Sequence, residues 1–352
     1  MTLDHVACLS VEPWDTVRRR NQHLAARLVR SGMVRRLTFV NPPEPGLALR
    51  ARRHSPEPGI DVVTPPLVVP RRWGGHAPLG WWTRRLIDGA QVVWVNDAVA
   101  GARALDRRTP AIYDVTDDWR EFEQSTRDRA RVIAAEDRLA ARALTTVCSN
   151  ELAARWRERY DVAATVVQNG VDLNAIRSAA PRPLAAEGPV AVYVGTLHRD
   201  RLDIDLLCSL RRSGSVGAVH LVGPDHLSFH DRRRLIDAGM RLEGPCPSED
   251  VPGWLVSADL LICPHVVTPF TLSLDAIKSH EYLATSRPIV ATPSSGFQDL
   301  VAPSLYVADA SKFVAAVASA LEAGPASRDI AVDWDDRAVQ FGSVLVAAVG
   351  ER

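Results

Sequence analysis

Lysine is almost absent from this chain of 352 residues. Only two of its 42 basic residues are lysines, Lys278 and Lys312, and the other 40 are arginines. A codon pool poor in lysine, as in a GC-rich genome, accounts for this bias and makes a lysine in a polar segment, such as Lys278, conspicuous. Net charge is absent too, because 42 acidic residues cancel the basic ones. A neutral chain has no overall attraction to nucleic acid, so we expect no nucleic-acid partner.

Cysteine pairs and long apolar segments are also missing. The five cysteines show no C-x-x-C spacing, and Cys8, Cys148 and Cys263 lie in or beside apolar runs, as small core residues in a reducing compartment do. No apolar run approaches the roughly 18 residues needed to cross a bilayer. Residues 1–10, MTLDHVACLS, lack the apolar core of a signal peptide. We therefore expect a cytoplasmic protein.

The fingerprints of three α/β enzyme classes are absent. No G-x-G-x-x-G follows the first apolar run, and neither G-x-x-x-x-G-K-[ST] nor G-x-S-x-G occurs. These absences argue against a dinucleotide oxidoreductase, a P-loop ATPase and an α/β-hydrolase.

Short apolar runs alternate with helical patterns along the whole chain. Strands buried on both faces read as continuous apolar runs, so this pattern predicts parallel sheets covered by helices. The expected strands are residues 5–9, 37–40, 92–95, 111–115, 145–148, 190–194, 218–222, 260–263 and 288–291. The expected helices are residues 18–30, 98–105, 128–143, 204–211, 230–238, 251–257, 276–284, 313–322 and 336–349.

An aperiodic segment rich in Ala and Pro, residues 177–189, divides this pattern into two similar halves. We expect an α/β protein with a first doubly wound domain over residues 1–176 and a second over 190–334. The final helix, within 335–352, would pack back on the first domain. Ligands bind outside the carboxyl ends of the strands in such sheets, so the chemistry belongs between the two domains.

The most informative stretch is residues 268–292, where a loop with Thr271 and Ser273 leads into a helix that Asp275 could cap. Lys278 and Glu281 stand three residues apart and share one helical face. A lysine beside free N–H groups at a helix start suits a diphosphate, and a carboxylate on the same face can accept both hydroxyls of a ribose. The alternative is an ordinary exposed Lys–Glu pair.

Residues 277–292, IKSHEYLATSRPIVAT, resemble the donor-binding signature of the retaining glycosyltransferases of family 4, in the branch reading P-L-K-L-x-E-Y-L-A. Other segments resemble motifs of this family in the same order. These are Trp14-Asp15 with Arg20, Gln22 and Leu24, the segment YDVTDDW at 113–119, NGVD at 169–172, VGTL at 194–197 and LVGP at 221–224.

The resemblance implies the GT-B fold, with a nucleotide-sugar donor held mainly by the second domain and a hydroxyl-bearing acceptor held mainly by the first. It also implies transfer with retention at the anomeric carbon. Many family members place a second glutamate eight residues before the ribose-binding one, where this chain has Ser273. Sugar recognition would then use Thr271, Ser273 and backbone groups.

The resemblance also implies that a basic residue in the loop after the first strand of the second domain reaches the diphosphate opposite the lysine. Arg201 is the first choice and Arg199 the alternative, with Gly195 and Thr196 lining the same loop. Either arginine could instead be an ordinary surface residue. His198, a lone loop histidine, is left out of the catalytic set.

Candidates for acceptor binding come from the first domain. Asp114, Asp117 and Asp118 follow an apolar run, so Asp117 or Asp118 could act as base or bind the acceptor hydroxyl. The alternative is that these carboxylates cap the next helix and pair with Arg120. The other acceptor candidates are Trp14, Arg20, Trp81 and Trp82.

Trp81 and Trp82 close a Gly- and Pro-broken segment, residues 70–85, with three tryptophans and four arginines. Aromatic faces stack on sugar rings, and Trp with Arg also suits a peripheral contact with the inner membrane face. The alternative is that one of the two tryptophans anchors a helix in the core.

Two D-x-D triplets raise the question of a metal. Asp203-Ile-Asp205 and Asp333-Trp-Asp335 each stand where a helix is expected to begin, and acidic residues are ordinary in a first helical turn. We expect structural roles for both triplets, no essential metal and no cofactor. The alternatives to a glycosyltransferase are a nucleotide-sugar epimerase of the same fold and a catalytically silent nucleotide-binding partner of another transferase.

Overall fold

The computed structural model describes residues 1–15, 17–45, 51–67, 77–106, 108–122, 124–326 and 331–350. The chain forms two compact units. The first comprises Met1–Gln168 with Trp334–Arg352, and the second comprises Asn169–Asp333.

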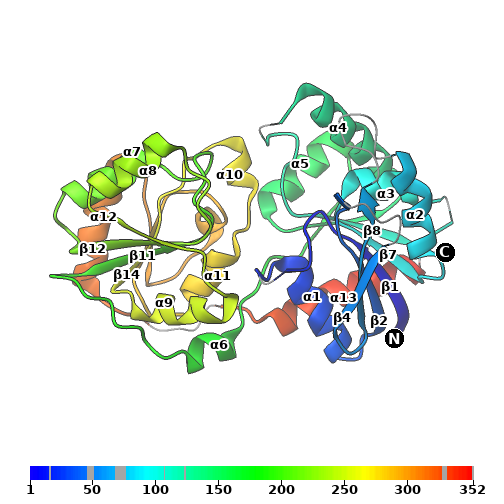
Figure 1. The fold of residues 1–352 in the computed structure, drawn as a ribbon, viewed down its shortest axis with the longest axis horizontal. Helices are drawn as coiled ribbons and strands as arrows, with labels where there is room; N and C mark the ends of the chain where they lie inside the picture. The colour runs from blue at the N-terminus through cyan, green and yellow to red at the C-terminus, as the bar shows by residue number, and fades with distance from the viewer. Residues whose placement is uncertain are drawn as a thin grey trace. The chain divides into compact units, whose positions relative to one another are not determined.

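The first unit is built on a sheet of eight strands in the order β10-β9-β8-β7-β1-β2-β5-β4 (Figure 1). All neighbours pair in parallel except β4, which runs antiparallel to β5 at the edge. The strands are β1 (Leu3–Leu9), β2 (Val34–Val40), β4 (Arg52–Glu57), β5 (Ile60–Thr64), β7 (Val92–Val95), β8 (Ala111–Val115), β9 (Leu144–Val147) and β10 (Thr165–Val166). Two short strands, β3 (Glu44–Pro45) and β6 (Pro66–Leu67), form a separate pair.

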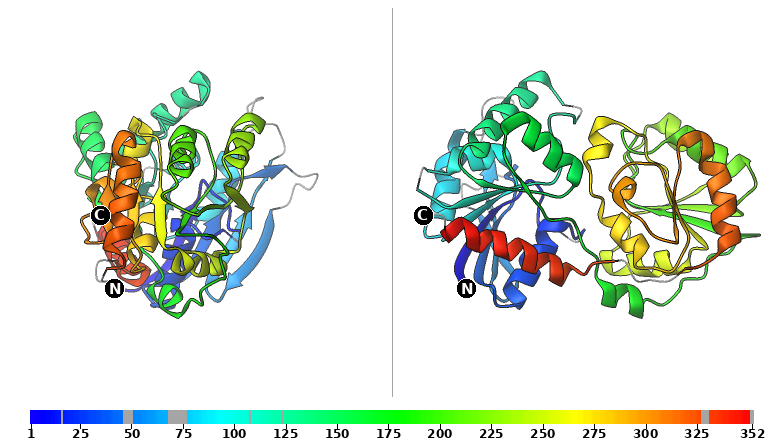
Figure 2. Two further views of the ribbon diagram at one scale, coloured as in Figure 1. Left: turned by 90° about the vertical axis from the view of Figure 1, so that its left-hand side faces the viewer. Right: turned by 180° about the vertical axis from the view of Figure 1, so that it is seen from behind.

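Helices complete the first unit, and one of them comes from the end of the chain. They are α1 (Arg20–Arg30), α2 (Ala77–Ile87), α3 (Ala98–Ala104), α4 (Thr126–Ala140), α5 (Asn150–Tyr160) and α13 (Trp334–Gly350). Helix α13 runs beside α1 (Figure 2, right). Its Phe341 ring lies 4.6 Å from that of Trp94 in β7, and Trp334 stacks on His23 of α1 at 4.7 Å. The last helix is therefore part of the first unit's core.

The second unit has a fully parallel sheet of six strands in the order β13-β12-β11-β14-β15-β16. Its strands are β11 (Val190–Val194), β12 (Ala218–Val222), β13 (Arg241–Gly244), β14 (Leu260–Cys263), β15 (Ile289–Ala291) and β16 (Leu305–Val307). Its helices are α6 (Leu173–Ser178), α7 (Ile204–Arg212), α8 (Phe229–Asp237), α9 (Val251–Ser257), α10 (Pro269–Ser273), α11 (Ile277–Leu283) and α12 (Ala310–Ala323). Helices α7 and α8 lie on one face of the sheet, and α9 and α11 lie on the other (Figure 1).

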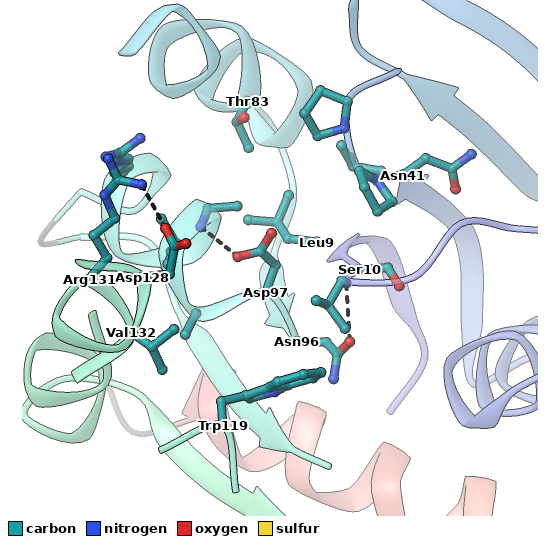
Figure 3. A pocket seen from close by; sticks show the side chains of 18 of the residues that line it. Leu9, Ser10, Asn41, Thr83, Asn96, Asp97, Trp119, Asp128, Arg131 and Val132 are labelled. Atoms are coloured by element: carbon teal, nitrogen blue, oxygen red, sulfur yellow. Dashed lines mark hydrogen bonds and ion pairs between the residues drawn. The ribbon is translucent and has the colours of Figure 1, made fainter. Parts of the chain in front are cut away.

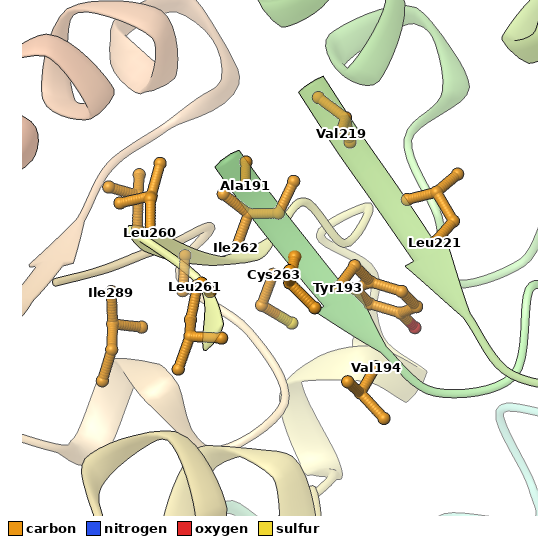
Figure 4. Packing of buried hydrophobic residues seen from close by; sticks show 14 of the residues in the cluster. Ala191, Tyr193, Val194, Val219, Leu221, Leu260, Leu261, Ile262, Cys263 and Ile289 are labelled. Carbon is orange, nitrogen blue, oxygen red and sulfur yellow. The ribbon is translucent and has the colours of Figure 1, made fainter. Parts of the chain in front are cut away.

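The central strands of this second sheet are buried along their whole length, because helices cover both faces. Every residue of β11, β12 and β14 is buried. Side chains such as Val219, Leu261 and Ile262 form the core drawn in Figure 4. The continuous apolar runs of the sequence thus mark these strands correctly, and β7, β8, β11, β12 and β14 have the expected bounds.

The domain boundaries differ from the expected ones. The first unit ends at Gln168, not at residue 176, and residues 177–189 belong to the second unit rather than to a linker between units. The reason is a local set of contacts within the second unit. Val171 forms a β-bridge with Asp333, whose carboxylate accepts the Leu173 N–H at 3.1 Å. The chain therefore enters and leaves the second unit at one place.

No helix in the described part of the chain is both long enough and apolar enough to span a membrane.

Candidate functional site

The second sheet has a topological switch point between β11 and β14. From β11 the chain order continues through β12 to β13 on one side, and from β14 it continues through β15 to β16 on the other. Ligands of doubly wound sheets bind outside the carboxyl ends of the strands at such a point. Gly195 follows β11 there, and His265 follows β14 two residues after its end.

Gly195 lets the backbone pass close to Lys278. Its φ of 147° is a conformation that favours glycine, and a Cβ at this position would collide with the Lys278 ammonium nitrogen. Gly223, at the end of β12, meets the carbonyl oxygen of Gly195 in the same way. The backbone after β11 and the backbone after β12 therefore pack closely together next to Lys278.

Lys278 is held at the switch point by Tyr193 of β11. Its Nζ donates a hydrogen bond of 2.7 Å to the Tyr193 hydroxyl and lies 4.0 Å from the centre of that ring. No carboxylate within the described ranges forms an ion pair with it. Burial, reinforced by the nearby positive charge of Arg201, lowers the pKa of Lys278 to about 8. The site thus presents a cation that an added anion would stabilise.

His265 extends this network from β14. Its Nε2 lies 3.1 Å from the Tyr193 hydroxyl, and its Nδ1 lies 2.8 Å from the Ser295 hydroxyl. Burial, together with the charges of Lys278 and Arg201, lowers the pKa of His265 well below its usual value, so the imidazole is neutral. The sequence analysis did not identify Tyr193 or His265. Their signal is position alone, since each stands at or just past the end of a strand at the switch point.

Glu281 lies one helical turn after Lys278 on α11. Burial raises the pKa of this carboxyl to about 7, although the positive charges of Lys278 and His280 oppose that rise. Glu281 forms no ion pair and no side-chain hydrogen bond with any residue that the structure describes. A half-buried carboxyl in this situation gains from hydroxyl donors supplied by a ligand.

Two buried residues fix α11 against the sheet. The Tyr282 hydroxyl accepts the N–H of Val194 at 3.0 Å and donates to the carbonyl of Ile262 at 3.4 Å, so it bridges β11 and β14. Asp275 accepts a hydrogen bond of 2.8 Å from His280 Nε2 and another from the N–H of Asn169. Asp275 was expected to cap the helix, but the N-cap is Ala276, because the Asp275 carboxylate is engaged in these other bonds.

The two arginines of the loop after β11 have different surroundings. Arg201 lies with its guanidinium carbon 5.5 Å from the centre of the Phe270 ring, and it forms no ion pair with a described residue. Its charge acts on Lys278 and His265. Arg199, the expected alternative, is instead paired with Asp231. Arg201 is therefore the arginine whose charge acts on the lysine, and the alternative, Arg199, stays a prediction.

The hydroxyls expected to contact the sugar are used within their own loop. The Thr271 hydroxyl donates to the carbonyl of Val266 at 2.7 Å, and the Ser273 hydroxyl donates to that of Phe270 at 2.7 Å. Both side chains are fully buried. Their assignment as sugar ligands is therefore wrong, because neither hydroxyl faces a space that a ligand could reach. Thr196 contributes its carbonyl, which accepts from the Tyr193 hydroxyl at 3.3 Å.

In the first unit, the structure pairs two expected acceptor ligands with each other. The carboxylate of Asp114 is fully buried and accepts from Arg20 through Nε at 3.2 Å and Nη2 at 3.1 Å. It also accepts from Thr146 Oγ1 at 2.8 Å and from Trp94 Nε1 at 3.3 Å. This satisfied network lies inside the core, so Asp114 and Arg20 are not acceptor ligands.

Asp118 is also a structural residue. Its buried carboxylate is held by Arg155 at 2.8 Å and by Arg159 at 2.8 Å, and these two arginines hold its pKa below the usual value against the opposing effect of burial. The expected partner Arg120 pairs with Glu136 and Asp137 instead. Asp118 is therefore wrong as a catalytic base. Asp117 is half-buried and accepts from the Thr116 hydroxyl at 3.0 Å, and its role stays a prediction.

The three tryptophans proposed for the acceptor have separate environments. Trp14 packs edge-on against Phe39 at 5.0 Å, with its backbone N–H bound to Asn41. Trp81 is 56% exposed on α2, and Trp82 lies 5.4 Å from it, ring centre to ring centre. Residues 70–76 of the same segment lie outside the described residues.

The acidic triplets begin helices, as expected. Asp203 is the N-cap of α7 and accepts from the Leu206 N–H at 2.9 Å, and Asp205 pairs with Arg234. Asp333 binds the Leu173 N–H, and Asp335 in the first turn of α13 lies 3.5 Å from Arg27. Across the described ranges, no three His, Cys, Asp or Glu side chains are grouped so that they could hold a metal ion.

Comparisons with known proteins agree with this geometry. Residues 188–323, which contain the switch point with Lys278, match the family described as Glycosyl transferases group 1. A curated protein of Bacillus subtilis (strain 168), provisionally described as the teichuronic acid biosynthesis glycosyltransferase TuaH, is 25% identical over 214 residues. The match covers 55% of this chain and 53% of TuaH, so it spans about half the length of that relative.

Solved structures resemble nearly the whole chain. Sucrose-phosphate synthase from Thermosynechococcus elongatus superposes with a TM-score of 0.75 at 16% identity, covering 99% of this chain and 100% of the other. HepE of Anabaena, in complex with UDP, gives a TM-score of 0.65 at 14% identity, covering 98% and 100%. The trehalose-phosphate synthase of Burkholderia vietnamiensis gives 0.65 at 10% identity, covering 100% and 94%. The chain has the GT-B fold of these glycosyltransferases.

Proposed function

We propose that this protein is a glycosyltransferase that moves a sugar from a nucleotide-sugar donor to a hydroxyl of an acceptor. One observation carries the proposal. Two neighbouring cations, Lys278 and Arg201, stand at the switch point of the second sheet with no carboxylate partner among the described residues. A diphosphate is the ligand that such a pair attracts, and the same residues lie within the part of the chain that matches the glycosyltransferase family.

The chemistry assigned to these residues is stabilisation of the leaving group. The bond between the anomeric carbon and the diphosphate oxygen breaks, the acceptor hydroxyl oxygen bonds to that carbon, and the hydroxyl proton leaves with the nucleoside diphosphate. Negative charge grows on the departing oxygen, where the Lys278 ammonium is directed. Retention is proposed from the family resemblance alone, and it requires the arriving oxygen to take the face that the departing oxygen leaves.

Glu281 is the proposed ligand of the ribose. Its carboxyl has no hydrogen-bond donor from the described protein residues, and two adjacent ribose hydroxyls would supply two. HepE, which shares the fold, has been solved with UDP and with UDP and glucose, which supports a uridine nucleotide as the first donor to test. Since positive side chains neutralise the phosphates, we propose that transfer needs no metal ion and no cofactor.

Ser273 supports a second candidate function. At this position many members of the resembled family have a glutamate, and here the serine hydroxyl is bound to its own loop. A protein lacking that carboxylate could bind nucleotide without turnover and serve as the partner of another transferase. A same-fold epimerase would instead turn over its nucleotide sugar with no acceptor.

The deciding experiment is a thermal-shift panel of nucleoside diphosphates and nucleotide sugars, followed by turnover assays with and without excess EDTA. A ligand at 100 times its dissociation constant stabilises the folded state by about 2.7 kcal/mol, which such a panel detects. We expect one nucleotide to bind and acceptor-dependent release of nucleoside diphosphate to persist in EDTA. Binding without turnover favours the partner role, acceptor-independent turnover favours the epimerase, and activity restored only by Mg²⁺ or Mn²⁺ contradicts the metal-free mechanism.

Proton exchange on binding UDP is expected to change sign with pH. In the free protein Lys278 is about half protonated near pH 8, and a bound diphosphate raises its pKa, so binding takes up protons above about pH 8. Glu281 is about half protonated near pH 7, and ribose hydroxyls lower its pKa, so binding releases protons below about pH 7. Calorimetry in buffers of different ionisation enthalpy measures both effects.

Two variants show how much of the proton exchange comes from Lys278 and Glu281 and how much comes from UDP itself. Lys278→Arg keeps the charge at all pH values and should abolish the uptake at high pH. Glu281→Gln should remove the protein's share of the release at low pH and weaken UDP binding by about 1.5–3 kcal/mol. A proton count identical in wild type and both variants would remove these residues from the nucleotide site.

A further inference from the structure

The first unit contains a pocket that has no part in the proposed nucleotide site. Its volume is about 500 Å³, within the range of about 300–1,000 Å³ of small-molecule sites (Figure 3). It lies at the switch point of the first sheet, where the neighbouring strands β1 and β7 lead to opposite sides. Ser10 and Val11 after β1, and Asn96 and Asp97 after β7, line it.

Three arginines are among the residues that line this pocket, Arg103 of α3 and Arg127 and Arg131 of α4. Two aspartates accompany them, but both carboxylates bind nearby protein groups. Asp97 accepts from the Ala100 N–H at 2.9 Å as the N-cap of α3, and Asp128 accepts from Arg131 at 2.9 Å (Figure 3). The pocket therefore carries more positive charge than its own carboxylates balance.

Arg103 carries part of this unbalanced positive charge. Its Nη1 is buried and has no hydrogen-bond partner within the described structure, and no ion pair with a described residue compensates its charge. Burial and the positive charges of Arg131 and Arg138 lower the pKa of Arg103 despite the opposing effect of Asp97. A buried guanidinium N–H without an acceptor is costly. Nη1 itself is closed to solvent, so an anion in the pocket would meet the charge of this guanidinium rather than that N–H.

The rest of the lining suits the ring of a sugar rather than a bare ion. Trp119 and the prolines Pro42, Pro43 and Pro65 supply flat or apolar surface. Aromatic rings cover the apolar faces of sugars. The pocket thus combines apolar surface with an excess of cationic side chains.

We propose that this pocket binds the acceptor and that the acceptor is a sugar bearing an anionic group, a phosphate monoester or a carboxylate, which Arg103 binds with Arg127 and Arg131. That the bound sugar is the acceptor rests on the proposed transferase function. The anion site itself is inferred from residues of the first unit alone. Arg103 is here a specificity residue, because it selects charged over neutral sugars and takes no part in bond breaking.

The test measures binding to the full chain by calorimetry, without donor, using glucose 6-phosphate, glucuronate, inorganic phosphate and glucose as probes. We expect one of the two charged sugars to bind at least about 10-fold more tightly than glucose and than inorganic phosphate. The stronger of the two identifies the anion. Equal affinities for glucose and both charged sugars overturn the proposal, and phosphate binding as tightly as the better sugar overturns its sugar component.

Arg103→Gln should weaken binding of the charged sugar about 10-fold or more and leave glucose binding unchanged. Arg138→Gln is the matched control, because Arg138 is close enough to act on Arg103 but does not line the pocket, and it should change binding less than 2-fold. Arg127→Gln provides a second test at an exposed position that folding does not depend on. Unchanged binding in both Arg103→Gln and Arg127→Gln would overturn the proposal.

UDP binding, measured on the same samples, distinguishes failure of the anion site from failure of the proposed transferase function. Arg103→Gln should bind UDP as wild type does, since Lys278 and Glu281 of the proposed nucleotide site belong to the second unit. A protein that binds the charged sugar but no nucleotide would retain the anion site and contradict the transferase function. A protein that binds nucleotide and transfers to neutral sugars alone would retain the transferase function and contradict the anionic acceptor.

Discussion

Replacing Lys278 with alanine is expected to lower kcat about 10²–10³-fold, equivalent to about 2.7–4 kcal/mol of transition-state stabilisation. The donor KM should rise much less. The lysine ammonium is a compact charge beside the Tyr193 hydroxyl, and in the proposed mechanism it follows the diphosphate oxygen as its negative charge grows. An interaction that strengthens during the reaction lowers kcat when it is removed, whereas one of constant strength affects KM. Steady-state kinetics with the donor identified by the panel measures both parameters.

The chain supplies its own control for this experiment. Lys312, the other lysine, is exposed on α12, and Lys312→Ala should leave both parameters unchanged. Lys278→Arg should restore activity only in part, because the larger guanidinium cannot occupy the space between Gly195 and the Tyr193 ring. A normal kcat with a raised KM in the alanine variant would show that the lysine binds donor and transition state equally.

Replacing Asp114 with asparagine is expected to destabilise the protein by about 3–5 kcal/mol. The neutral amide leaves the buried Arg20 guanidinium without its counter-charge. In either orientation of the amide, its N–H₂ group faces one N–H of Arg20 and either the Trp94 Nε1–H or the Thr146 hydroxyl, and the first two of these can only donate. Urea unfolding at constant m-value measures the loss.

An exposed ion pair serves as the reference for that loss. Arg35 and Asp4 lie 2.9 Å apart with side chains 76% and 63% exposed, and Arg35→Gln should cost no more than about 1 kcal/mol. A cost of this small size for Asp114→Asn would contradict the structural role of the network and return Asp114 to the acceptor candidates. Arg20→Met combined with Asp114→Leu should recover much of the stability, because it removes both buried charges together.

Much of the fold could be predicted from the sequence, because a buried strand is a local pattern. A run such as residues 92–95 is apolar at every position only when both faces are covered, and β7 has these bounds. The antiparallel edge strand β4 was not predicted. Its six residues, Arg52–Glu57, are mostly exposed and carry neither a continuous nor an alternating apolar signal.

The sequence by itself determined where the proposed nucleotide site lies, since Lys278 and Glu281 are three residues apart on one helix and the loop with Arg201 directly follows a strand. Only the tertiary structure decided which charged side chains are free to meet a ligand. Asp114 finds Arg20 across 94 residues of chain, and Arg103 lines a pocket whose walls come from four strand ends and three helices. The physical reason is that the free energy of a buried charge depends on the groups folded around it, and those groups are set by strand order and helix packing rather than by neighbours in sequence.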